Sequence, residues 1–166
     1  MPKDHLTFQT GTAPEINLTR VGGNLRLSGW DRTEISAEGD ADEMTGQCEN
    51  DRATLEFSND VTLFVPEQSI LHIGQISGDA RIKFLSGALD IKAALGDLEL
   101  RKVAAARIEK VSGDFSAKKV DGDLEVGHAL ASGSVRDVRG RFSAGQVSGD
   151  LYLRGVNGAV ELKTLG

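Results

Sequence analysis

The stretch from Ile76 to Lys102 reads ISGDARIKF (76–84), LSGALDIKA (85–93) and ALGDLELRK (94–102), so one nine-residue unit occurs three times in succession. The unit returns from Val111 onward as VSGDFSAKK, VDGDLEVGH, VRGRFSAGQ, VSGDLYLRG and VNGAVELKT. A short unit with a fixed period cannot bury an apolar face alone, so neighbouring units must stack on one another. The repeats therefore predict a single domain over residues 1–166, with regular nine-residue units over 71–166.

Each unit has the pattern of one strand and one turn. Gly usually occupies the third position, while the fifth and seventh positions are apolar, as in Leu89/Ile91 and Leu124/Val126. Alternation with period two is typical of a strand that buries one face, and Gly marks the turn. Nine residues leave no room for a helix beside the strand. The first position is mostly apolar, and we expect it to point inward at the corners.

A longer period lies above the first. Ser-Gly-Asp recurs at Ser77, Ser112 and Ser148, with separations of 35 and 36 residues, or two steps of about 18. We therefore predict an all-β fold, a single-chain parallel β-solenoid (β-helix) with about 18 residues and two strands per coil. The stretch from Arg101 to Lys110 is one residue short of the pattern, which predicts a tightened corner.

Residues 1–70 follow the pattern more loosely. Residues 21–30 have the spacing of the repeat, and strands are expected over 33–37, 53–57 and 61–65. The polar residues 38–51 indicate a loop or an irregular hairpin. We interpret residues 1–70 as an irregular N-terminal β cap together with the first coils. Ten acidic residues between Asp31 and Asp60 face two basic ones, which fits a solvated acidic cap or a patch for a polycation.

The sequence lacks the usual motifs of enzymes, which favours a non-enzymatic protein. With 39% hydrophobic and 27% charged residues, the chain is expected to be globular. Cys48 has no partner for a disulfide, and the three histidines lack metal-ligand spacing. The usual nucleophile, phosphate-loop and zinc motifs are missing, so we predict no catalytic, cofactor or metal site. Residues Asp121, Asp123, Arg139 and Arg141 could meet on one side, as in enzymes that cleave acidic polysaccharides, but the loops that would form a groove are missing.

Neither a signal-peptide pattern nor a long apolar segment occurs in the sequence. We therefore expect no membrane insertion, and a cytoplasmic location for the chain as written.

The segments "NLTRVGGNLRLSGWDRTEISAEG" and "LFVPEQSILHIGQISGDARI", followed by serial V-x-G-D-L-x-L units, resemble the bacterial putative-adhesin family of β-strand repeats. The resemblance covers the chain from about Ile16 to Gly166. It implies a single-chain parallel β-solenoid of unknown function, often tied to the cell envelope, with an adhesive or scaffold role. The family offers no catalytic residues to carry over.

Stacking of the coils aligns equivalent outward positions into columns. One column holds cations and is expected to bind a linear polyanion, such as an acidic glycan or a nucleic acid, or else to keep a flat sheet soluble. A second column holds Asp79, Asp97, Asp114 and Asp150, with Ser132 at a break. Calcium binding is one interpretation of this column, and stabilisation of each turn through the aspartate's own backbone contacts is the other. The cation column consists of Lys83, Arg101, Lys118, Arg136 and Arg154.

The last residues, Leu165 and Gly166, begin a further unit and then stop. An exposed last coil offers unpaired backbone to another strand, so the chain is a candidate for end-to-end association with itself. The residues expected at this edge are Val156, Val160, Leu162 and Leu165.

Overall fold

The computed structural model describes residues 3–40, 44–49 and 51–165 of the chain. These residues form sixteen strands and no helix, so the all-β prediction is confirmed. None of the described segments could cross a membrane as a long apolar helix. The strands are β1 (Lys3–Gln9), β2 (Glu15–Val21), β3 (Leu25–Trp30), β4 (Glu34–Asp40), β5 (Met44–Glu49), β6 (Arg52–Phe57), β7 (Val61–Pro66), β8 (Ile70–Ile76), β9 (Ala80–Ala94), β10 (Leu98–Val111), β11 (Phe115–Val120), β12 (Leu124–Ala129), β13 (Gly133–Val138), β14 (Phe142–Val147), β15 (Leu151–Val156) and β16 (Val160–Leu165).

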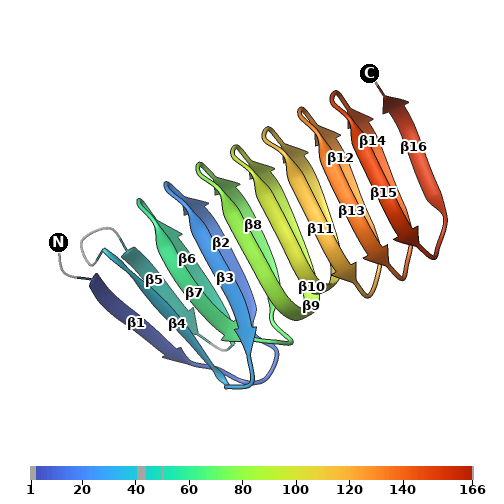
Figure 1. Cartoon of the computed structure of the whole chain (residues 1–166). Helices are drawn as coiled ribbons and strands as arrows, with labels where there is room; N and C mark the ends of the chain where they lie inside the picture. Colours follow the sequence, from blue (N-terminus) through green and yellow to red (C-terminus); the bar gives the residue numbers. More distant parts are fainter. Residues whose placement is uncertain (1–2, 41–43, 50, 166) are drawn as a thin grey trace.

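The strands form two rows that lie face to face, and from β11 onward consecutive strands alternate between the rows (Figure 1). The first row has the order β1-β4-β7-β3-β9-β10-β11-β13-β15. The second row has the order β5-β6-β2-β8-β9-β10-β12-β14-β16. Strands β9 and β10 belong to both rows because each continues around the corner from one to the other.

Along the first row the pairs from β7–β3 to β13–β15 are parallel, and along the second row so are the pairs from β6–β2 to β14–β16. Phe115 of β11 pairs with Gly133 of β13, and Gly133 pairs with Leu151 of β15, which are steps of 18 residues. The step from Leu98 to Phe115 is 17 residues. The shorter step includes the stretch expected to form a tightened corner. There the register of β10 against β9 shifts between Val103 and Ala105.

The N-terminal strands differ from the rest in their pairing. β1 pairs antiparallel with β4, β4 with β7, and β5 with β6. Of the two interpretations of residues 38–51, the hairpin is confirmed, because β5 pairs antiparallel with β6. The loop alternative is wrong for the described residues, since β4 extends to Asp40, and residues 41–43 and 50 lie outside them.

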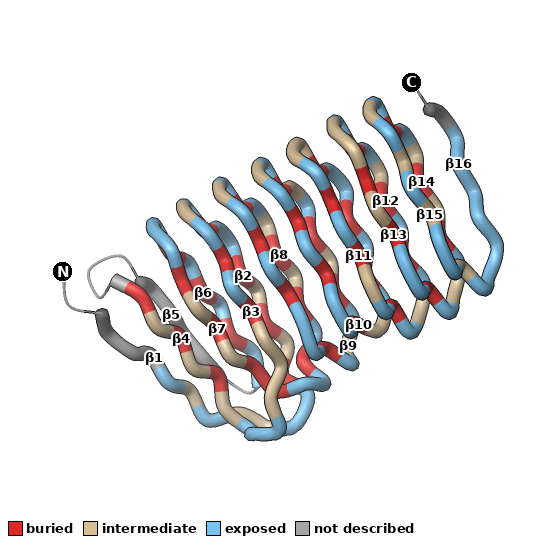
Figure 2. The backbone as a smooth tube through the Cα atoms, viewed as in Figure 1, coloured by how far each residue is buried: buried red, intermediate tan, exposed pale blue. Residues whose placement is uncertain are grey.

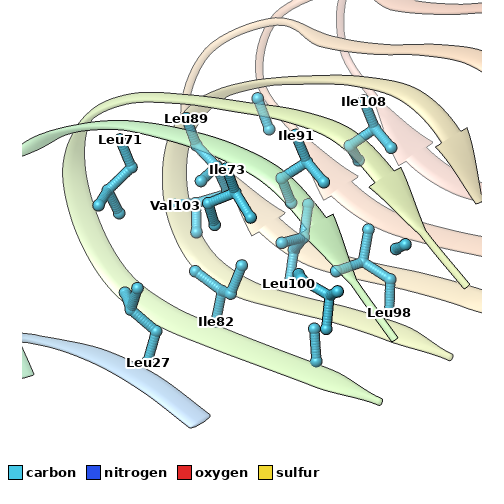
Figure 3. Close-up of a cluster of buried hydrophobic side chains, with 14 of the residues drawn as sticks. Leu27, Leu71, Ile73, Ile82, Leu89, Ile91, Leu98, Leu100, Val103 and Ile108 are labelled. Carbon is cyan, nitrogen blue, oxygen red and sulfur yellow. The ribbon is translucent and has the colours of Figure 1, made fainter. Parts of the chain in front are cut away.

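The apolar side chains of both rows meet in one core between them (Figure 2). In Figure 3, Leu27, Ile82 and Leu100 of the first row point toward Leu71 and Ile91 of the second. The first position of the unit is buried at the corners, as predicted. Buried corner residues include Ile76, Leu85, Val111, Val120, Val138 and Val147.

The core is narrow enough that side-chain volume is shared between neighbouring strands. Gly133 takes the place of an apolar residue in β13, and a Cβ there would collide with the buried ring of Phe115 in β11. The space left by the absent side chain of Gly133 is filled by the ring of Phe115 from the neighbouring strand, as close packing requires.

Candidate functional site

Five cationic side chains lie at one register position of five neighbouring strands in the first row. Arg101 of β10 pairs with Lys83 of β9 and with Lys118 of β11. Arg136 of β13 pairs with Lys118 and with Arg154 of β15. Parallel strands are about 4.8 Å apart, so the row extends over about 19 Å. We call these five residues the cation column.

The cation column is accessible to solvent, and its charges are not paired with carboxylates in the described part of the chain. Lys118 is half-buried and the other four side chains are exposed. Within the described residues, none of the five lies within 4.0 Å of a carboxylate. The neighbouring Glu99 is paired with Arg81 at 3.5 Å. The positive charge of the column is therefore not cancelled by direct ion pairs.

The corner that follows the column adds further cations that the sequence analysis missed. Lys102 and Lys119 follow Arg101 and Lys118 directly, and both are exposed with φ angles of 54° and 59°. The amino group of Lys102 lies 5.1 Å from the centre of the Phe84 ring. A sequence pattern that assigns the ninth position only to a turn gives no reason to add these lysines to the face.

The outer face of the second row has mixed charge. His72, Asp90, Arg107 and Glu125 share one register position in β8, β9, β10 and β12. The imidazole Nε2 of His72 lies 3.5 Å from Glu15. Interspersed signs are sufficient for solubility. The first row differs in that the five residues at the register position of the column are all cationic.

The aspartate column has a structural role. The backbone N–H of Asp97 donates to Oδ1 of Asp79 at 2.9 Å, and that of Asp114 donates to Oδ1 of Asp97 at 2.9 Å. Ser132 N–H donates to Asp114 Oδ1 at 3.1 Å, and Asp150 N–H to Ser132 Oγ at 3.2 Å. The expected contact with the aspartate's own backbone is therefore wrong, because Asp79, Asp97 and Asp114 each accept from the turn 17 or 18 residues further along the chain. Within the described part of the chain, no cluster of His, Cys, Asp or Glu could hold a metal ion.

The charged residues of the polysaccharide-cleaving interpretation do lie together. Arg139 Nε lies 3.7 Å from Asp121 Oδ1. The backbone N–H of Arg141 donates to Asp123 Oδ1 at 2.8 Å. Arg141 also lies 3.7 Å from Glu161. In the structure, the carboxylate of Asp121 contacts a guanidinium group and that of Asp123 accepts from a backbone N–H group.

The residues expected at an end-to-end edge lie in the last two described strands. In the described part of the chain, β15 pairs only with β13 and β16 only with β14. Val160 is 46% exposed and Leu162 is 36% exposed, whereas Val156 is half-buried. The side chain of Leu165 lies outside the described residues.

Several solved structures are similar to this chain. A putative adhesin from Bacteroides fragilis is 13% identical, with a TM-score of 0.38 and coverage of 97% of both chains. A putative cell adhesion protein from Clostridium sporogenes is 12% identical, with a TM-score of 0.35 and coverage of 99% of both chains. A putative adhesin from Parabacteroides distasonis is 12% identical, with a TM-score of 0.35 and coverage of 97% of both chains.

These neighbours are putative adhesins. Their names agree with the family resemblance found in the repeats. No family model matches the chain, and no curated protein matches it significantly. Overlap at this level assigns no activity, so the proposed function rests on this chain's own residues.

Proposed function

We propose that residues 1–166 form a single β-solenoid domain that acts as a non-enzymatic structural and adhesive module. In this proposal each coil has about 18 residues and two strands. The parallel register of the two rows supports it, because the same 17- and 18-residue steps recur along the chain. The resemblance to the adhesin family implies a place at the cell envelope for such a module.

The adhesive surface in this proposal is the outer face of the first row, and its ligand is a linear polyanion. The observation that carries the proposal is the cation column, whose five charges share one register position and are free of ion pairs within the described residues. Each anion of a bound polymer would displace counterions, so binding would weaken steeply with salt.

The test compares two triple variants of equal net charge. Arg101→Ser, Lys118→Ser and Arg136→Ser remove the centre of the column, whereas Lys92→Ser, Arg107→Ser and Lys163→Ser remove exposed cations of the second row. Binding to immobilised polygalacturonate and single-stranded DNA is measured over a range of salt concentrations. We expect the column variant to lose about tenfold or more in affinity for a polyanion and to show a flatter salt dependence. Equal losses in the two variants would refute the column as the binding surface.

We also propose self-association of the polypeptide 1–166 through the open edges of β15 and β16. Unpaired strand edges accept another strand, and exposed Val160 and Leu162 would gain burial at such a junction. Size-exclusion chromatography with light scattering should show oligomers whose population grows with concentration. Leu162→Lys, which places a charge at the junction, should shift them to monomers. A strict monomer at high concentration would contradict this route.

A further inference from the structure

A hollow of about 460 Å³ opens at the N-terminal end of the cation column. It lies where β7, β3 and β9 run side by side, and Ser28 of β3 pairs with Phe64 of β7 and with Lys83 of β9. The small side chain of Ser28 stands between two large ones, which leaves the space. The hollow is lined by Arg26, Leu27, Ser28, Thr62, Phe64, Arg81, Ile82, Lys83, Phe84, Glu99 and Arg101.

Two aromatic rings border this hollow. Phe64 stacks on Trp30 with the ring centres 5.1 Å apart, which holds the Phe64 ring in place. Phe84 is 41% exposed and is held at the corner with a φ of 61°. A Cβ on Gly29 would collide with the carbonyl oxygen of Phe84, so this glycine allows the corner of β9 to approach β3 closely.

Cations surround the same space. Lys83 and Arg101 of the cation column line the hollow, together with Arg26 and Arg81 of the adjacent register position. The amino group of Lys83 lies 5.4 Å from the centre of the Phe84 ring. Aromatic rings with a few placed polar groups are typical of small-molecule sites, and guanidinium groups match the geometry of carboxylates.

We propose that the hollow is the primary subsite for an acidic polysaccharide that carries one carboxylate on each sugar, a deepening that rests on the proposed polyanion-binding function. One sugar packs its apolar face on Phe84 and Phe64 while Arg26 binds its carboxylate, because Arg81 is already paired with Glu99 of the same lining. The following sugars lie along the cation column, since Lys83 and Arg101 belong to both.

The position of the aromatic rings favours a glycan over a nucleic acid. Proteins that bind single strands stack successive bases along the groove. In the first row, Phe64 and Phe84 lie at one end of the column and Tyr152 lies at the other, so β10, β11 and β13 between them present Glu99, Ser116 and Ser134 rather than rings beside the cations.

The test measures binding of oligogalacturonates to the full chain by titration calorimetry, with neutral dextran and single-stranded DNA as comparison ligands. Ser28→Phe should fill the hollow and weaken oligogalacturonate binding about tenfold or more, and Phe84→Ala should weaken it about fivefold. Ser143→Phe adds the same ring to the outer face of the second row and should bind as the wild type does. Thermal unfolding followed by circular dichroism verifies that each variant is folded.

The outcomes separate this inference from the proposed function. Loss of binding in the column variant with unchanged binding in Ser28→Phe and Phe84→Ala would overturn the subsite while the polyanion face stands. Tighter binding of single-stranded DNA than of oligogalacturonate would overturn the glycan assignment. A wild-type chain that binds no polyanion would overturn both proposals.

Discussion

Single side chains hold one repeat to the next at the turns. Along the first corner, Asn24 accepts from the N–H of Asp79 at 2.8 Å, and Asp79 accepts in turn from Asp97. A turn amide has no partner inside its own strand, and the side chain of the preceding repeat supplies one. This explains why the Ser-Gly-Asp motif recurs, because the carboxylates of Asp79 and Asp114 each accept a hydrogen bond from the turn 18 residues further on.

Asp97→Ala should lower the free energy of unfolding by about 0.5–1.5 kcal/mol, because the N–H of Asp114 loses its acceptor. Asp97→Asn keeps an oxygen at the same place, as Asn24 does natively, and should cost much less. Urea denaturation of the two variants is the measurement. If the alanine and asparagine variants are equally stable, the hydrogen bond does not stabilise the stack.

At the scale of elements, neighbouring strands share the volume of the core. Phe115 of β11 extends over Gly133 of β13, where a side chain would collide with it. The sequence analysis predicted inward-facing apolar pairs correctly, since they depend on period two within one unit. It did not find the Phe115–Gly133 contact, because that contact joins residues 18 positions apart in a unit that departs from the pattern.

Gly133→Ala should destabilise the chain by about 1–3 kcal/mol through overpacking against Phe115. Phe115→Leu replaces the phenyl ring with a shorter aliphatic side chain and should relieve the collision, so the double variant should be more stable than the sum of the two single losses predicts. A double-mutant cycle in urea measures this coupling. Strict additivity would mean that the two residues do not share the space.

At the scale of the whole molecule, the two rows present different outer faces on one scaffold. The column of cations was predictable because it follows from a fixed repeat length and parallel stacking. The hollow beside it was not predictable, since Trp30, Phe64 and Phe84 come from three separate segments that pair only in the folded chain. The antiparallel pairing of β1 with β4 was not predicted, although the strand expected over 33–37 is β4 and the expected hairpin is β5 with β6.

The most direct test of the account is the distance between spin labels on Arg81 and Tyr152 in a Cys48→Ser background. These positions are outward-facing and are linked through Glu99, Ser116 and Ser134, four strand steps along the first row. Four strand steps separate the two backbones by about 19 Å. Double electron–electron resonance should therefore give one narrow distance distribution near 20 Å, to which the label linkers add their own length. A broad distribution, or one centred far beyond that value, would contradict the parallel stack on which the cation column depends.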